Sequence, residues 1–129
     1  MNTNLTNNLV LAFIGDSVYE TKVREFLILS KINKVKELQK ETKKYVTAKQ
    51  QALILKRLTD IAFFDDLELE VIKRARNAKV NSCPKNTDIL TYKYATGLEA
   101  LIGFLYLNNK KQRIDEIMSK IFNMEDLCI

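Results

Sequence analysis

Hydrophobic residues recur at intervals of three and four positions along most of the chain, which is the spacing of one face of an α-helix. Short polar stretches interrupt this pattern and divide it into six segments. The chain is therefore predicted to be all-α. The predicted helices cover residues 6–29, 34–45, 48–59, 65–77, 88–107 and 110–122.

Side chains that cap helices mark several of the predicted starts. Thr47 and Asp65 are each followed three residues later by Gln or Glu, which is the spacing of a capping box. Thr87 precedes the long fifth segment and is its predicted cap. The only proline of the chain lies just before it, in residues 78–86. We therefore predict the principal loop there.

Composition narrows the class of protein without assigning a function. The 129 residues suffice for one core, so we expect a single domain over residues 1–129. A net charge of +5 weakly favours a polyanionic partner such as nucleic acid. The chain has no His, which excludes a Ser–His–Asp triad and His-ligated zinc. No uncharged stretch after residue 15 is long enough to span a membrane.

Two isolated acidic residues stand in otherwise uncharged segments. Asp16 is the first charged side chain of the chain, and it directly follows Gly15 within an apolar run. Glu99 is the only charged residue between positions 94 and 109. On helices, both side chains share a face with apolar neighbours, so we expect both carboxylates to lose much of their hydration. Each then requires a compensating partner.

The glycines predict where these acids meet. All three, Gly15, Gly97 and Gly103, lie in the two segments that carry Asp16 and Glu99. A glycine inside a helix costs about 1 kcal/mol relative to alanine, and a close approach of two helix backbones would offset that cost. We infer that the two helices cross closely and bring the carboxylates together.

Neighbouring carboxylates repel each other unless a proton or a cation joins them, and three interpretations are open at this point. The first is structural bonding to hydroxyl groups, Lys or Arg. The second is an acid–base pair of the glycosidase kind. The third is a Mg²⁺ site completed by water and substrate phosphate oxygens. The excess of basic over acidic residues favours the Mg²⁺ site, because a bound polyanion would complete the coordination of the ion.

The same residues resemble the motifs of a known family. Residues 13–18, FIGDSV, resemble the ribonuclease III signature. Residues 99–103, EALIG, followed by Tyr106 and Leu107, resemble its second catalytic helix. Further similarity covers residues 43–52, 76–79 and 84–107, in the same order and spacing. The chain is most similar to the small bacterial Mini-III ribonucleases, which consist of the nuclease domain alone.

The resemblance implies a ribonuclease III-like helical domain that forms a homodimer and cleaves double-stranded RNA. It implies Mg²⁺ as cofactor, with Mn²⁺ as a substitute, and products with 5′-phosphate and 3′-hydroxyl ends. It also implies a cytoplasmic enzyme that matures precursor large-subunit (23S) ribosomal RNA, with a ribosomal protein as helper and without a separate double-stranded RNA-binding domain.

By motif position, Asp16 and Glu99 are the metal-binding catalytic acids that the resemblance implies. The broader ribonuclease III family has two further acids, at the positions of Ala12 and Thr96 here. The Mini-III branch resembles this chain in lacking both acids. Because these two possible ligands are missing, the number of metal ions stays open. Glu20 lies one turn after Asp16 and has two interpretations. It either holds an outer-shell water or pairs with Arg24 at i,i+4 spacing.

Two basic tracts are candidates for RNA contact. Residues 31–56 hold eight lysines against two glutamates, a composition that also suits a solvated helix face. The second tract enters the predicted loop, has no acidic residue between positions 73 and 85, and suits the phosphates of an A-form duplex better. Its predicted RNA-contact residues are Lys73, Arg74, Arg76, Asn77, Lys79, Lys85 and Asn86. The alternative function is a non-catalytic helical RNA-binding or ribosome-associated module.

Overall fold

The computed structural model describes residues 7–79, 83, 85 and 87–124, which contain helices and no strand. The prediction of an all-α fold is confirmed, and each boundary lies within two residues of its predicted position. The helices are α1 (Asn8–Leu29), α2 (Val35–Val46), α3 (Ala48–Asp60), α4 (Asp66–Arg76), α5 (Ile89–Leu107) and α6 (Lys111–Phe122). None of these helices is both long and apolar enough to cross a membrane.

The local capping groups explain most of these boundaries. Thr47 caps α3 as predicted, because its hydroxyl accepts from the Gln50 amide. Asp65 and Glu68 form the complete predicted capping box at the start of α4. The cap of α5 is Asp88 and not Thr87, because the Asp88 carboxylate accepts from the backbone and hydroxyl of the residue three positions on.

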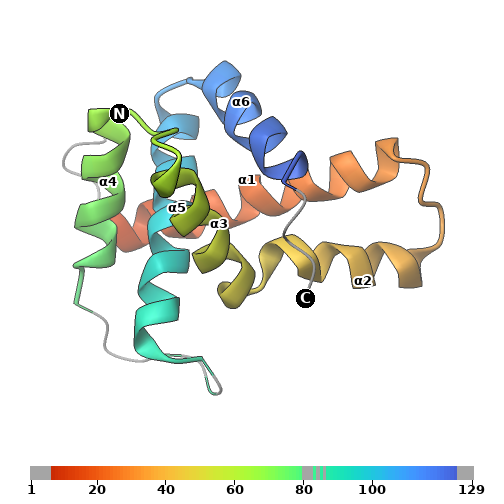
Figure 1. Ribbon diagram of the computed structural model, residues 1–129, viewed down its shortest axis with the longest axis horizontal. Helices are drawn as coiled ribbons and strands as arrows, with labels where there is room; N and C mark the ends of the chain where they lie inside the picture. The colour runs from red at the N-terminus through yellow and green to blue at the C-terminus, as the bar shows by residue number, and fades with distance from the viewer. Residues whose placement is uncertain (1–6, 80–82, 84, 86, 125–129) are drawn as a thin grey trace.

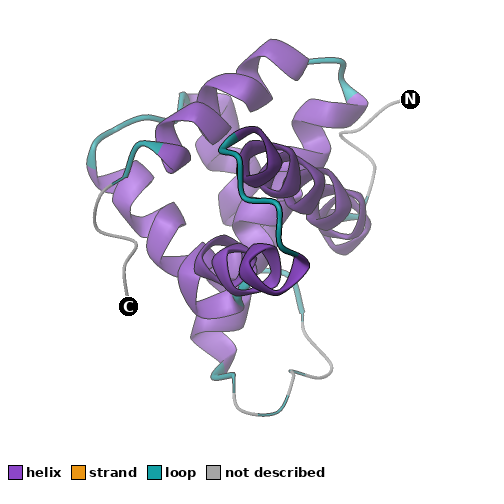
Figure 2. Cartoon of the chain, turned by 90° about the vertical axis from the view of Figure 1, so that its right-hand side faces the viewer, coloured by secondary structure: helices purple, strands orange, loops and turns teal. Residues whose placement is uncertain are grey.

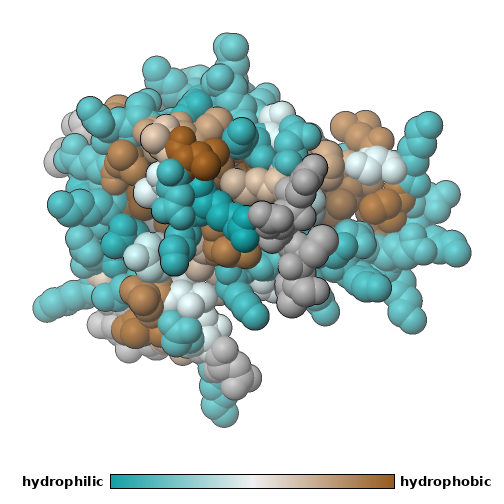
Figure 3. Space-filling view, in the orientation of Figure 1, coloured by the Kyte–Doolittle hydropathy of each residue, from teal (hydrophilic) through white to brown (hydrophobic). Residues whose placement is uncertain are grey.

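Helix α5 lies at the centre of the fold, with α1, α3 and α4 packed against it (Figures 1 and 2). It supplies more buried residues than any other described helix, since its middle is apolar on every side. The second half of α1 extends past α5 and pairs with α2, which has no fully buried residue. Figure 3 shows apolar surface at this end of the molecule, where Ile28, Leu29 and Val35 are exposed.

Two glycines allow α1 and α5 to cross with their backbones in contact. A Cβ atom on Gly15 would collide with the carbonyl oxygen of Glu99, and one on Gly103 with the carbonyl oxygen of Leu11. The predicted close crossing is therefore confirmed for these two residues. Gly97 differs, because it faces α4, where its nearest neighbours are side-chain atoms of Arg76 and Ile72 at 3.2 and 3.3 Å.

A buried ion pair joins α4 to α6. Glu68 is 3% exposed, and its carboxylate accepts two hydrogen bonds of 2.8 Å from the Arg113 guanidinium. The same guanidinium donates to the carbonyl of Phe63 and lies 4.7 Å from the centre of that ring. This bidentate geometry satisfies a carboxylate that would otherwise be buried without a counter-charge.

Removing Arg113 should therefore destabilise the protein far more than removing a surface charge. Arg113→Met keeps the apolar stem but leaves Glu68 unpaired, which should lower the free energy of unfolding by about 3 kcal/mol. Asp115→Asn is the control, because it breaks a surface pair in which Asp115 is 62% exposed, and should cost less than about 1 kcal/mol. Urea unfolding measures both, and equal losses in the two variants would contradict this account.

Candidate active site

The crossing of α1 and α5 brings the two isolated acids together. Gly15 packs against the backbone of Glu99, so Asp16, the next residue, lies beside the same turn of α5. The Asp16 carboxylate interacts directly with the carboxyl group of Glu99, through a hydrogen bond and through its charge. The proximity inferred from the glycine pattern is therefore correct, while the catalytic role of the pair stays a prediction.

The burial of the two acids differs from the sequence-based expectation. Glu99 is half-buried, but Asp16 is exposed, so the expectation that Asp16 loses its water is wrong. The physical reason is the orientation of α1, whose core-facing side follows Leu11, Gly15, Tyr19 and Val23 at four-residue spacing. Asp16 lies at the edge of that side and remains open to solvent.

Burial and the Asp16 charge both favour the protonated form of Glu99. Desolvation is the largest cause, Asp16 adds to it, and together they raise the pKa of Glu99 from 4.5 to about 9. The nearby Gln51 amide acts in the opposite direction. Without a cation, the pair therefore holds a proton at neutral pH. A divalent cation between the two groups would favour the ionised form of Glu99.

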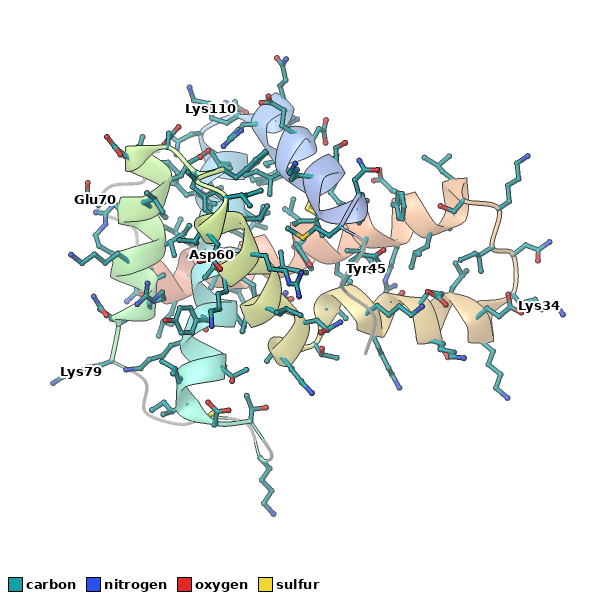
Figure 4. All side chains as sticks on the ribbon, viewed as in Figure 1. Lys34, Tyr45, Asp60, Glu70, Lys79 and Lys110 are labelled. Carbon is teal, nitrogen blue, oxygen red and sulfur yellow. The ribbon has the colours of Figure 1, made fainter. Side chains whose placement is uncertain are left out.

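Two buried polar residues around Glu99 were not predicted from the sequence. Tyr19 is fully buried, its pKa is raised by burial, and its hydroxyl donates to the carbonyl of Tyr45 at 2.7 Å, which ties α1 to the end of α2 (Figure 4). Gln51 on α3 is 2% exposed and reaches the Glu99 carboxyl group. A signal for Gln51 existed, because it shares a helix face with Ile54 and Leu58.

Glu20 is paired with Arg24 at 3.0 Å, so the interpretation as an i,i+4 ion pair is confirmed. The Arg24 and Glu20 side chains are 66% and 41% exposed, and a pair so accessible to solvent contributes little to stability. The interpretation of Glu20 as the holder of an outer-shell water stays a prediction.

The predicted RNA-contact residues fall at the end of α4 and beyond it. Lys73, Arg74 and Arg76 belong to its last turn, Asn77 caps it, and Lys79 and Lys85 are exposed; Asn86 lies outside the described residues. Arg76 differs from its neighbours, because its guanidinium lies 4.6 Å from the centre of the Tyr94 ring and its stem contacts Gly97. Part of its side chain is thus used in joining α4 to α5.

The donor set at the crossing suits a hard divalent cation. Mg²⁺ is bound in proteins through one or two carboxylates and keeps several positions for water and phosphate oxygens. Asp16 and Glu99 supply two carboxylates, one of them exposed. Among the described residues, no group of three or more His, Cys, Asp or Glu side chains is placed to hold a metal ion, so a fully protein-enclosed site is absent from this part of the chain.

The raised pKa of Glu99 should make the metal-free protein less stable as pH rises. Between pH 4.5 and about 9 the unfolded chain releases this proton while the folded chain keeps it. The contribution of Glu99 to the free energy of unfolding is therefore fully present below about pH 4.5 and is lost progressively as the pH rises toward 9. Unfolding by urea in EDTA at pH 5, 7 and 8.5 measures the trend. Glu99→Gln should lack this component, and an identical pH dependence in both proteins would contradict the assignment.

Comparisons with known proteins reveal similarity along most of the chain. The model of the Ribonuclease III domain family matches residues 9–110, which include both acids. The Mini-ribonuclease 3 of Brevibacillus brevis is 50% identical over 119 residues, covering 92% of this chain and 87% of the relative. The Mini-ribonuclease 3 of Staphylococcus aureus is 41% identical over 120 residues, covering 93% and 90%. A crystal structure of a Fusobacterium nucleatum protein superimposes with a TM-score of 0.81 at 34% identity, covering 92% and 94%.

Proposed function

The chain belongs to the ribonuclease III family, as an endoribonuclease for double-stranded RNA, and on that premise we propose that Asp16 and Glu99 hold the divalent ion that its reaction uses. The observation that supports this most is the direct interaction of the two carboxyl groups at a backbone-to-backbone helix crossing. The ion is proposed to be Mg²⁺, with Mn²⁺ as a substitute, because two carboxylates with open positions suit these hard cations.

Asp16 and Glu99 have different roles in the proposed reaction. Half-buried Glu99 would provide the less mobile carboxylate, whereas Asp16 is exposed and would remain accessible to a phosphate group of the substrate. When bound, the ion supplies a water of lowered pKa and neutralises charge on the phosphoryl oxygens. Hydrolysis would break the bond between phosphorus and the 3′ oxygen, which takes up a proton and leaves as a 3′-hydroxyl, while the water oxygen stays on phosphorus and the other fragment carries the 5′-phosphate. No His is needed for this scheme.

The exposed apolar stripe at the start of α1 supports the proposal of a homodimer. Leu9, Val10 and Phe13 are 39%, 53% and 82% exposed, and burial of such side chains against a second copy would stabilise association. Phe13 lies one turn before Asp16 on the same helix. A symmetric pair joined along this stripe would therefore place its two sites near the interface, as cutting both strands of a duplex requires.

The substrate that we propose is precursor 23S ribosomal RNA, cleaved in the cytoplasm with a ribosomal protein as helper. The support is the similarity to the Mini-ribonuclease 3 relatives and the basic end of α4. Incubation with precursor ribosomal RNA, with and without Mg²⁺, and sequencing of the new ends tests this. Cuts opposite each other in a duplex region are expected only with the ion. Cleavage of generic duplex RNA without defined cuts in the precursor would overturn only the assignment of precursor 23S ribosomal RNA as the substrate. The proposed metal site would stand.

A non-catalytic RNA-binding module is the less supported alternative. The relatives that match nearly the whole chain are named ribonucleases, and the two acids of the signature are present and adjacent here. We therefore do not retain this alternative.

The basic end of α4 is proposed to contact RNA phosphates. In an Asp16→Asn background, which prevents cutting, Lys73→Ala combined with Lys79→Ala should weaken duplex binding and reduce the slope of log affinity against log salt by about 2. Lys110→Ala is the control, because Lys110 is also exposed but lies at the top of the view, whereas Lys79 lies at the lower left (Figure 4). Gel shifts at several salt concentrations measure both. Equal slopes in parent and double variant would contradict the assignment.

A further inference from the structure

The guanidinium group of Arg76 lies on an aromatic ring, and no described residue accepts a hydrogen bond from it. Its central carbon, Cζ, is 4.6 Å from the centre of the Tyr94 ring, within the range of a cation–π contact. The Arg76 stem passes Gly97, where a Cβ atom would come within 3.2 Å of the Arg76 Cγ atom. The side chain of Arg76 is therefore held against α5 at two points along its length.

A second arginine–aromatic stack in the same molecule provides a contrast. Arg113 lies 4.7 Å from the centre of the Phe63 ring, nearly the same distance as in the first stack. Its guanidinium, however, donates two hydrogen bonds to the Glu68 carboxylate and one to the carbonyl of Phe63. The Arg76 guanidinium has neither kind of acceptor among the described residues. Its N–H donors are therefore available to an acceptor from outside the protein.

The surroundings of the Arg76–Tyr94 stack favour an anionic acceptor. The chain has no acidic residue between positions 73 and 85. A cavity of about 480 Å³ opens beside the stack between α3, α4 and α5, and Lys56 and Asp60 line it together with the stacked pair. The cavity thus presents two cations against one acid. A basic residue at the end of a helix also interacts favourably with the helix dipole, but that interaction requires no aromatic ring on a neighbouring helix.

The stack leaves the donors of the guanidinium accessible. Arginine presents its five N–H groups at the edge of a planar group, so a ring that covers one face leaves the edge open to a phosphate. A guanidinium that is already held in place also loses less freedom on binding than a mobile one, which raises affinity. Tyr94 can therefore strengthen a phosphate contact of Arg76 without touching the phosphate itself.

We propose that Tyr94 is a positioning residue for RNA binding, which holds the Arg76 guanidinium against α5 so that its N–H edge donates to a phosphate group of the duplex. This inference rests on the proposed function, because it requires that the end of α4 contacts RNA. It adds a residue of α5 to that basic surface and assigns the stack a role in binding besides joining the two helices.

The test measures duplex binding in EDTA, where no divalent ion supports cutting. Tyr94→Leu should weaken binding about fivefold, as expected for loss of a cation–π contact, and should leave the salt dependence unchanged because no cation is lost. Arg76→Met should weaken binding and reduce the slope of log affinity against log salt by about 1. Tyr94→Phe keeps the ring and should bind as the parent does. Phe63→Leu is the matched control, because it removes the ring beneath Arg113, and should leave binding unchanged.

A double variant separates positioning from general packing. In the Arg76→Met background, Tyr94→Leu should cause no further loss of affinity, because no guanidinium remains for the ring to hold. A similar loss in both backgrounds would show a packing effect and would overturn the inference. Parental affinity for Tyr94→Leu would overturn it as well.

The outcomes also separate this inference from the proposed function. If Tyr94→Leu binds as the parent does while Lys73→Ala combined with Lys79→Ala still reduces the salt slope, only the role of Tyr94 is wrong. If neither that lysine variant nor Arg76→Met changes the slope, the proposed RNA contact at the end of α4 fails, and the role of Tyr94 fails with it.

A measurement on the unmodified protein keeps the inference testable if Tyr94→Leu does not fold. The Nε–H signal of Arg76 in a ¹⁵N–¹H spectrum should move on addition of duplex RNA in EDTA, as expected for a new charge-assisted hydrogen bond, while that of Arg113 should not. Nuclear Overhauser contacts between Arg76 and the Tyr94 ring should persist in the complex. An unmoved Arg76 signal at saturating RNA, or loss of those contacts, would contradict the proposal.

Discussion

Asp16→Asn and Glu99→Gln should each slow the cleavage of double-stranded RNA by at least about a thousandfold. Each substitution removes one of two proposed carboxylate ligands, and a lost contribution of about 4 kcal/mol to transition-state stabilisation corresponds to that factor. Single-turnover rates with excess protein measure the effect. Duplex binding should persist, because the proposed phosphate contacts lie at the end of α4 and not at the acids.

Glu25→Gln is the matched control for charge, since Glu25 is exposed on the same helix and lies nine residues after Asp16. Its cleavage rate should remain within about twofold of the parental rate, as for a surface substitution distant from the site. Parental rates for Asp16→Asn or Glu99→Gln, under conditions where duplex binding is intact, would contradict the assignment of the two acids.

Gly15→Ala should prevent stable folding, with a loss of roughly 4 kcal/mol or more in the free energy of unfolding. The new methyl group would collide with the Glu99 carbonyl and with the backbone amide of Gly103, so the helices would have to separate. No rotamer can relieve a collision between a Cβ atom and a backbone. Circular dichroism and urea unfolding measure the effect.

Gly97→Ala is the control for Gly15→Ala, because it makes the same substitution in the same pair of crossing segments. Its methyl group would meet side-chain atoms at 3.2 and 3.3 Å, which can move by a few tenths of an ångström, and a carbonyl oxygen only at 3.5 Å, an ordinary contact distance. The gain in helix propensity of about 1 kcal/mol should offset that adjustment. A Gly15→Ala protein as stable as Gly97→Ala would show that the crossing tolerates a side chain.

The helices and their closest crossing could be predicted from the sequence because both depend on local rules. Periodic apolar positions and capping residues define where helices begin and end, as Asp65 does for α4. A glycine inside a helix has a cost that calls for a packing reason, and for Gly15 and Gly103 the reason was the predicted one. Gly97 shows the limit of this inference, because the position of a glycine does not reveal which helix packs against it.

The exposure of Asp16 could not be predicted, because an apolar residue looks the same in a core and at an intermolecular surface. Phe13 and Leu9 made the face of Asp16 appear buried, yet Phe13 is 82% exposed. Helix α1 is apolar on more than one side, so periodicity alone did not identify the side that faces α5. Only the tertiary arrangement distinguishes the two sides.

Gln51 was missed for a different reason. A polar residue at a core position of a helix predicts burial, but it does not reveal its partner, which here belongs to α5. The long-range pairing of Glu68 with Arg113 was likewise invisible, since nothing in the sequence distinguishes these two residues from the other Glu and Arg residues of the chain. Such contacts depend on how helices distant in sequence are arranged.

The position of a bound metal ion tests the central claim most directly. Crystals soaked in Mn²⁺ and measured near its absorption edge should show an anomalous peak between α1 and α5, with one oxygen of Asp16 and one of Glu99 each about 2.1 Å from it. Peaks confined to other parts of the surface, in a protein that cuts duplex RNA in the same Mn²⁺ buffer, would contradict the claim that these two acids hold the catalytic ion.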